Sequence, residues 1–153
     1  MPTHINELKP GLRFLSVGRI HPIKNYEFAA KCLASCANTM CIDITYQLIG
    51  PVEDKVEKSL IEQHQSNSLT IEILGEKSPN DLGKYYQNAQ CLLVPSLSEN
   101  FGLVVTEALG NGLPVIASDH TPWGQHPSNA VLQCLPLNED VWINSITQQL
   151  SNS

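Results

Sequence analysis

The sequence predicts an α/β fold, a doubly wound parallel sheet flanked by helices. Strand-like apolar runs alternate with helical stretches along most of the 153 residues, and three of these runs end at a glycine. A fourth run, QCLLVPS at 90–96, is apolar without alternation, as expected of a central parallel strand that is buried on both faces. The length suits one domain and no linker or repeat interrupts the chain, so we treat 1–153 as a single domain.

The elements predicted in the first half rest on hydrophobic periodicity. RFLSVG at 13–18 is rich in strand-forming residues and ends at a glycine. The apolar residues of 26–37 recur at three- and four-residue steps, which is typical of an amphipathic helix. IDITYQLIG at 42–50 forms the second strand, and a charged stretch at 53–64 with an apolar inner face forms the next helix.

The second half continues the alternation. The predicted elements are, in order, a strand at 69–75, a helix starting at Ser78-Pro79, the strand at 90–96, a helix at 102–110, strands at 113–119 and 130–135, and a helix at 138–150. Repeated strand–helix–strand units pack as right-handed crossovers over a parallel sheet. Ligands of such sheets bind beyond the carboxyl ends of the strands, so we expect the polar residues after those ends to form the site.

Charge and composition exclude several classes of protein. The net charge of −6 argues against a general nucleic-acid binder, which carries a basic face. The five cysteines form an odd set without a CxxC pair, which indicates buried thiols in a reducing compartment. The polar N-terminus has no signal-like apolar core, and no apolar run approaches the ~20 residues of a membrane span. We therefore expect a cytoplasmic location.

The loop after the first strand, Gly18 to Asn25, contains two cations. Arg19 and Lys24 would both lie at the ligand edge of the sheet, where a guanidinium and an ammonium suit a phosphate. The alternative is that they are ordinary surface cations. Their shared position in one strand-to-helix loop favours the phosphate interpretation.

A second loop, Leu97 to Gly102, precedes an apolar helix. A glycine at a helix start lets a ligand approach the backbone, and the free N–H groups of 102–104 form an anion site. Together with Arg19 and Lys24 they predict a pyrophosphate cradle. The chain contains neither the GxxxxGK[ST] phosphate loop nor the GxGxxG dinucleotide fingerprint.

Two glutamates, Glu99 and Glu107, flank this helix start with seven residues between them. They could be a catalytic pair, two contacts to one ligand, or solvated helix charges. A glycosidase needs its carboxyl groups within about 5–9.5 Å. Eight helical steps already rise roughly 12 Å, and the stretch before Gly102 is more extended than a helix. The spacing therefore favours two contacts to different ends of an elongated ligand.

A third loop, DHTPWG at 119–124, follows the strand LPVIAS. Asp119 or His120 could bond a ligand, and Trp123 could stack on a ligand, on a partner domain or within its own loop. There is no DxD and no histidine, cysteine or carboxylate set with metal-ligand spacing, and His120 and His126 are too poorly placed for a zinc site. We therefore expect no metal and no cofactor.

These motifs resemble a known family. SVGR followed by a lysine, then LIG, then ILG, then VPSLSENFGLVVTEALGNGLPVIASD is similar to the C-terminal, donor-binding domain of retaining glycosyltransferases of the GT-B fold, in glycosyltransferase family four. The similarity covers about 13–123. It implies a Rossmann-like domain that forms the C-terminal half of a GT-B fold. It also implies transfer of a sugar from a UDP- or GDP-sugar to a glycan or lipid-linked acceptor, as in bacterial surface polysaccharide synthesis.

The resemblance also implies residue roles. Arg19 and Lys24 would neutralise the donor's diphosphate and Glu99 would hold hydroxyls of the transferred sugar, which makes these three the catalytic residues. Glu107 would bind the ribose hydroxyls, with Thr106 beside it. The base would lie near the loop after Gly75, around Glu76, Lys77 and Ser78. The other donor-binding positions that the resemblance implies are Gly18, Asn100, Phe101, Gly102 and Leu103.

The chain also departs from the family pattern. A complete enzyme has an N-terminal acceptor domain, which this sequence lacks, so we expect an excised domain, a truncated product or one half of a split enzyme, with little activity alone. Its expected partners are the nucleotide-sugar donor, the missing domain or a partner chain, and a membrane approached through a lipid-linked acceptor. Family members often have a carboxylate after the glycine of the last loop, whereas Gln125 follows Gly124 here. The alternative functions are a non-catalytic nucleotide-binding partner domain, or an epimerase or phosphorylase on the same fold.

Overall fold

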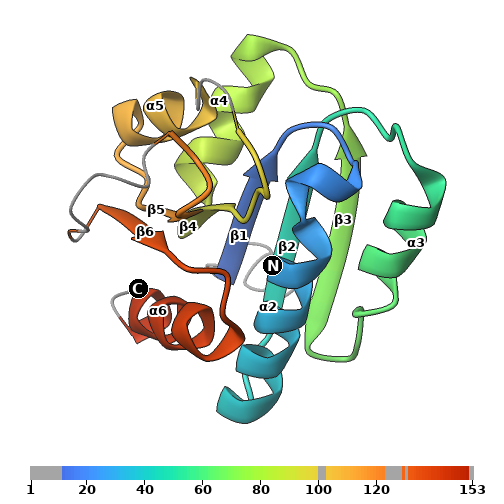
Figure 1. The fold of residues 1–153 in the computed structure, drawn as a ribbon, viewed down its shortest axis with the longest axis vertical. Coiled ribbons are helices and arrows are strands. Elements are labelled where there is room, and N and C mark those ends of the chain that lie inside the picture. Colours follow the sequence, from blue (N-terminus) through green and yellow to red (C-terminus); the bar gives the residue numbers. More distant parts are fainter. Residues whose placement is uncertain (1–11, 100–102, 123–128, 130, 152–153) are drawn as a thin grey trace, which may run out of the picture.

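The computed structural model describes residues 12–99, 103–122, 129 and 131–151. Its centre is a six-stranded sheet in which every neighbouring pair is parallel, in the order β3-β2-β1-β4-β5-β6 (Figure 1). The strands are β1 (Leu12–Val17), β2 (Ile44–Ile49), β3 (Leu69–Gly75), β4 (Cys91–Val94), β5 (Val115–Ser118) and β6 (Leu132–Leu135). The order reverses between β1 and β4, which confirms the predicted doubly wound sheet.

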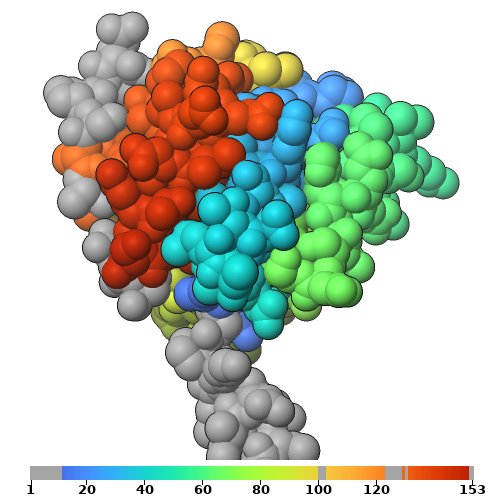
Figure 2. All heavy atoms as spheres, turned by 90° about the horizontal axis from the view of Figure 1, so that it is seen from below, coloured from blue at the N-terminus to red at the C-terminus, as the bar shows by residue number. Residues whose placement is uncertain are grey.

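Helices lie between consecutive strands from β1 to β5, a last helix follows β6, and together they cover both faces of the sheet. They are η1 (Pro22–Lys24, a single 3₁₀ turn), α2 (Tyr26–Met40), α3 (Lys55–Glu62), α4 (Pro79–Asn88), α5 (Leu103–Gly110) and α6 (Glu139–Ser151). Each α-helix lies within a few residues of its predicted range. Helix α2 packs against both α3 and α6 on one face, whereas α4 and α5 contact the strands of the other. Figure 2 shows α6, in red, beside α2, in blue and cyan.

Two hydrophobic clusters form the core, one on each face of the sheet. Successive side chains of a strand point to opposite faces, so Phe14 of β1 joins the cluster under α2 while Leu15 joins the cluster under α4 and α5. Leu92 and Leu93 of β4 divide in the same way. Burial on both faces explains why QCLLVPS is apolar without alternation.

The cysteines are free thiols, and burial is confirmed for three of them. Cys32, Cys36 and Cys91 are buried, but Cys41 is exposed and Cys134 is partly buried. The prediction that all five are buried is therefore wrong for the last two, because Cys41 ends α2 in a left-handed turn and Cys134 lies on the edge strand β6. Within the described ranges, no helix is long and apolar enough to cross a membrane.

The glycines that end the strands bring the backbones together. Gly50 has φ of +147°, and a Cβ there would lie 2.1 Å from the Gly18 carbonyl oxygen, so only glycine fits. The Gly18 N–H donates to the Ile49 carbonyl at 2.8 Å, and the Gly50 N–H donates to the Gly75 carbonyl at 2.9 Å. These contacts hold the carboxyl ends of β1, β2 and β3 at one edge.

Candidate functional site

The loop after β1 is fixed against the loop after β4. Turn η1 begins at Pro22, and the His21 Nδ1 that caps it accepts from the Ile23 N–H at 3.2 Å. Asn25 then adopts a left-handed conformation that starts α2, and its amide donates to the Pro95 carbonyl at 3.0 Å. The Leu97 N–H donates to the Ile23 carbonyl at 2.9 Å. This docking places Lys24, the last residue of η1, opposite the loop that contains Glu99.

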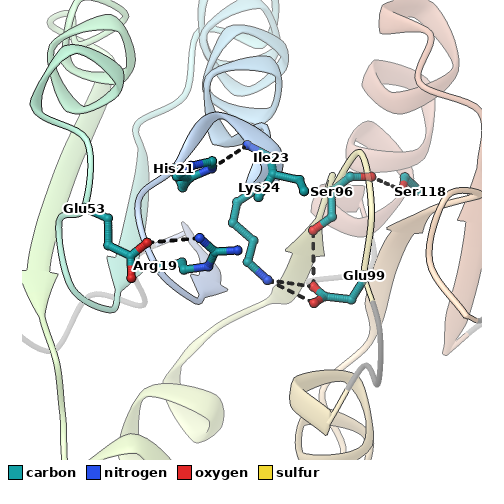
Figure 3. Close-up of polar contacts among 8 residues, drawn as sticks. All are labelled: Arg19, His21, Ile23, Lys24, Glu53, Ser96, Glu99 and Ser118. Carbon is teal, nitrogen blue, oxygen red and sulfur yellow. Dashed lines mark hydrogen bonds and ion pairs between the residues drawn. The ribbon is translucent and has the colours of Figure 1, made fainter.

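Lys24 and Glu99 form an ion pair at the point where β1 and β4 end. The Lys24 ammonium lies 3.1 and 2.9 Å from the two Glu99 carboxylate oxygens (Figure 3). Their side chains are only 14% and 21% exposed, so this pair is screened less than a surface pair. The Ser96 hydroxyl donates to the same carboxylate at 3.3 Å. Ser118 of β5 in turn donates to the Ser96 carbonyl at 2.6 Å, which ties the pair to a third strand.

A small cavity of about 110 Å³ adjoins this ion pair. Gly18, Lys24, Tyr26 and Glu99 line it together with apolar residues of β4 and the first turn of α5. Most ligand pockets enclose roughly 300–1,000 Å³, so this cavity admits one part of a ligand, such as a phosphate or one edge of a sugar ring. One cation, one carboxylate and one phenol over an apolar floor suit an anionic, hydroxyl-rich ligand.

Arg19 does not line this cavity, although the sequence places it in the same loop as Lys24. Its guanidinium lies 3.0 Å from the Glu53 carboxylate, and both side chains are nearly half exposed (Figure 3). A surface pair of this kind contributes at most ~1 kcal/mol, so an incoming anion can displace it. Arg19 thus borders the site at the surface, and Lys24 lies deeper.

Glu107 of α5 has a separate environment from Glu99. It is exposed, and the Tyr86 hydroxyl of α4 donates to its carboxylate at 3.3 Å. Burial, and next the nearby Glu107 carboxylate, raise the pKa of Tyr86, so this phenol stays protonated and remains a donor. Glu99 has its polar partners on η1 and beside β4, whereas Glu107 is held by α4. The two glutamates do not share a partner among these contacts.

The other predicted residues divide into three groups. Gly18 and Leu103 line the cavity, and Thr106 is exposed on α5. Glu76, Lys77 and Ser78 follow β3, where Ser78 accepts from the Asp81 N–H at 3.3 Å and caps α4. Lys77 also lines an open groove of about 270 Å³ along α4. The third group lies outside the described residues and comprises Asn100, Phe101, Gly102, Trp123, Gly124, Gln125 and His126.

In the loop after β5, the described residues 119–122 do not form a binding site. The His120 imidazole lies 3.6 Å from the Asp119 carboxylate, with both side chains about half exposed. In the part of the chain that the structure describes, no group of three histidine, cysteine or carboxylate side chains is placed to hold a metal ion.

Sequence reasoning missed three polar residues of this edge. Ser96 and Tyr86 hold the two glutamates, and Tyr26 lines the cavity. Tyr26 is the first residue of α2, where the helical pattern alone indicates a core position. Its distance of two residues from Lys24 was the available signal, because a helix start after a ligand-binding loop keeps its first side chain near that loop.

Comparison with known proteins reveals the family. The family model described as glycosyl transferases group 1 matches residues 4–126. The chain is 34% identical over 138 residues to the O-antigen chain mannosyltransferase RfbU of Salmonella typhimurium, a match that covers 87% of this chain and 37% of the relative. It is 28% identical over 173 residues to the UDP-N-acetylglucosamine–peptide N-acetylglucosaminyltransferase GtfA subunit of Limosilactobacillus reuteri, covering 96% and 32%. The chain thus spans about a third of the length of these two relatives.

Solved structures share the fold at low sequence identity. Anabaena HepE in complex with UDP and glucose aligns with a TM-score of 0.76 at 19% identity, covering 97% of this chain and 42% of that one. The C-terminal domain of the glycosyl transferase group 1 family protein LpcC from Francisella tularensis aligns with a TM-score of 0.75 at 19% identity, covering 95% and 79%. The match of the family model over most of the sequence shows that the chain belongs to the glycosyl transferases group 1 family.

Proposed function

We propose that this chain is the donor-binding domain of a retaining glycosyltransferase, and that it forms the C-terminal half of a GT-B enzyme of glycosyltransferase family four. The observation that supports the proposal is the cavity at the carboxyl ends of β1 and β4, lined by both Lys24 and Glu99. A cation and a hydroxyl-binding carboxylate side by side suit the junction of a phosphate and a sugar. Membership of the family supports the same assignment.

The proposed roles follow the two environments of the glutamates. Lys24, with Arg19 at the surface, binds the diphosphate, and Glu99 accepts hydrogen bonds from hydroxyls of the transferred sugar. The ion pair between Lys24 and Glu99 holds both side chains in place before the donor arrives. Glu107, more exposed and held by Tyr86, binds the ribose hydroxyls. The residues after β3 lie near the base.

The reaction breaks the bond between the anomeric carbon and the leaving phosphate oxygen. Positive charge develops on the sugar ring and negative charge on the departing diphosphate, and Lys24 and Arg19 stabilise that negative charge. The acceptor hydroxyl attacks the anomeric carbon from the face that the diphosphate leaves and gives its proton to the departing phosphate oxygen, so the anomeric configuration is retained. In this proposal the cations and backbone amides do this work without a metal ion.

The acceptor site lies outside this chain in the proposal. It belongs to another part of the same protein or to a partner chain, so the chain alone binds donor and transfers little sugar. RfbU is named as an O-antigen chain mannosyltransferase. By analogy we propose a UDP- or GDP-sugar donor, a glycan or lipid-linked acceptor at the cytoplasmic membrane surface, and a role in surface polysaccharide synthesis.

A binding measurement tests the proposal. Thermal unfolding of the chain is followed with UDP-glucose, UDP-N-acetylglucosamine and GDP-mannose at millimolar concentration. At 100 times the dissociation constant, binding adds about 2.7 kcal/mol to the free energy of unfolding. We expect one nucleotide sugar to raise the midpoint clearly. Absence of any shift, with calorimetry also showing no heat of binding, would contradict the proposal.

A matched pair of lysine variants tests the site. Lys24→Ala should weaken the binding of the selected nucleotide sugar at least tenfold, since the ammonium is the cation that lines the cavity. Lys31→Ala is the control, because Lys31 is an exposed lysine of α2 paired with Glu139 at 3.1 Å. It removes the same charge from the protein and should leave binding unchanged.

A further inference from the structure

Tyr26 places a hydroxyl group in the cavity beside Lys24. The residue is 3% exposed and lines the cavity. A Cβ built on Gly18 would lie 2.5 Å from the Tyr26 hydroxyl oxygen and 3.5 Å from Lys24 Cε. The phenol oxygen therefore lies against the Gly18 backbone, next to the lysine side chain, and only the absence of a side chain at Gly18 leaves room for it.

This hydroxyl differs from that of its neighbour in the core, Tyr46. The Tyr46 hydroxyl lies 2.6 Å from Ser16 Oγ, and because Ser16 donates its own proton to the Leu93 carbonyl, Tyr46 is the donor to Ser16. Among the described residues, none forms a comparable hydrogen bond with the Tyr26 hydroxyl. The Tyr26 oxygen is not one of the fully enclosed side-chain atoms that lack a partner in the described part of the chain, so it reaches the space of the cavity, where a ligand can supply a hydrogen-bond partner.

The surroundings keep the Tyr26 phenol protonated. Burial raises its pKa well above the ordinary value of 10.0, and Tyr46 and Glu99 add to this rise while Arg19 opposes it. The group is therefore neutral at physiological pH and has one proton to donate. In this form it does not serve as a base, and its oxygen is a weaker acceptor from sugar hydroxyls than the Glu99 carboxylate.

We propose that the Tyr26 hydroxyl donates a hydrogen bond to a phosphate oxygen of the nucleoside diphosphate, beside the ammonium of Lys24. The inference rests on the proposed function and adds a residue that selects for the diphosphate. A phosphate oxygen is an acceptor without a proton of its own, and it is drawn to this end of the cavity by Lys24. A hydrogen bond to a charged acceptor is stronger than one to a neutral acceptor, and the apolar floor strengthens it further.

Titration calorimetry with Tyr26→Phe tests the inference. The probes are UDP and GDP, with uridine and guanosine as the matching ligands that lack phosphates. Loss of the hydroxyl should weaken binding of the selected diphosphate about tenfold and leave binding of its nucleoside unchanged. The substitution removes one oxygen that forms no hydrogen bond with another described residue, so the thermal midpoint without ligand should change little.

Tyr46→Phe is the matched control and should give the opposite result. It removes the donor to Ser16, so the thermal midpoint should fall while diphosphate affinity stays at the wild-type value. Unchanged diphosphate affinity in Tyr26→Phe, or an equal loss for the nucleoside, overturns the inference and leaves the proposed function standing. If the wild-type chain binds neither diphosphate, the proposed function fails and the inference fails with it.

Discussion

The Lys24 ammonium contacts both carboxylate oxygens of Glu99, although 75 positions separate the two residues in the sequence. One residue follows β1 and the other follows β4, and these strands are neighbours where the sheet order reverses. The pair therefore marks the crevice in which doubly wound folds bind their ligands. It also keeps a cation and an anion mostly buried and mutually neutralised.

A double-mutant cycle should detect the coupling between Lys24 and Glu99 in the free energy of unfolding. Lys24→Met or Glu99→Gln alone leaves one mostly buried charge without its partner and should lower the free energy of unfolding by about 1–2 kcal/mol. The double variant should lose clearly less than the sum of the two single losses. Urea unfolding of the four proteins measures the coupling. Strict additivity would show that the ion pair contributes nothing measurable.

The two glutamates should separate in their effects on binding. Glu99→Gln should reduce the affinity for a nucleotide sugar to that for its nucleoside diphosphate, because the lost contacts are to the sugar. Glu107→Gln should weaken the diphosphate itself and abolish the preference for ribose over 2′-deoxyribose. Calorimetry with UDP-glucose, UDP and 2′-deoxy-UDP, or the GDP series, measures both effects. Identical profiles for the two variants would contradict the separate roles.

Tyr86 should act as a positioning residue for Glu107. Tyr86→Phe removes the hydroxyl that donates to the Glu107 carboxylate. We expect about a two- to fivefold loss of nucleoside diphosphate affinity and a smaller preference for ribose over 2′-deoxyribose, since a net hydrogen bond of about 0.5–1 kcal/mol is lost. Tyr85→Phe, the adjacent residue on α4, is the control and should preserve that preference. If Tyr86→Phe keeps the wild-type preference for ribose over 2′-deoxyribose, the Tyr86 hydroxyl does not position Glu107 for binding and contributes to stability alone.

The buried thiol of Cys32 should destabilise the fold at alkaline pH. Burial, with a smaller contribution from Glu139, raises the pKa of Cys32 from 9.0 to about 12. Above pH 9 the unfolded chain loses this proton while the folded chain keeps it, so the stability present below pH 9 declines as the pH rises toward 12. The decline is about 1.4 kcal/mol per pH unit for one thiol. Urea unfolding at pH 8 and 10.5 should show a smaller drop for Cys32→Ala than for the wild type.

Trp142 should be the main anchor of α6. Its side chain is fully buried, and its Nε1 donates to the Pro136 carbonyl at 2.9 Å. Its ring packs edge-on against the ring of Phe28 in α2, with the two ring centroids 5.5 Å apart. Trp142→Ala should lower the free energy of unfolding by about 3–5 kcal/mol. Trp142→Phe, which keeps part of the ring contact, should cost clearly less. Equal midpoints for both variants in thermal unfolding would show that α6 docks by other contacts.

Hydrophobic periodicity predicted the helices and strands because the face of an element that is buried determines the spacing of its apolar residues. Two-sided burial of β4 appears as an unbroken apolar run, and the helical face of α2 appears as three- and four-residue steps. The helix start at Ser78 was also predicted correctly, because capping depends on neighbouring residues alone. The strand-ending glycines were recognised, but their reason was not, since the close approach of Gly50 to Gly18 joins two separate strands.

The candidate site was predictable as a set of loops but not as a set of contacts. Arg19 and Lys24 are close in sequence, yet one pairs with Glu53 at the surface and the other with Glu99 in the cavity. Tyr86 gave no signal that distinguishes it from a core tyrosine, and Tyr26 gave only its distance of two residues from Lys24. Their roles depend on which side chain lies opposite, and a single sequence does not specify that.

The sequence alone determined the α/β class, the parallel sheet and the edge at which the loops of the candidate site gather, because hydrophobic spacing, turn glycines and strand ends are local properties. Only the tertiary structure decided that Lys24 contacts Glu99, that Arg19 remains at the surface, and that Tyr26 lines the cavity beside Lys24. Those outcomes depend on the strand order β1-β4 and on close packing across loops some 75 residues apart, where a shift of a few ångströms exchanges one partner for another.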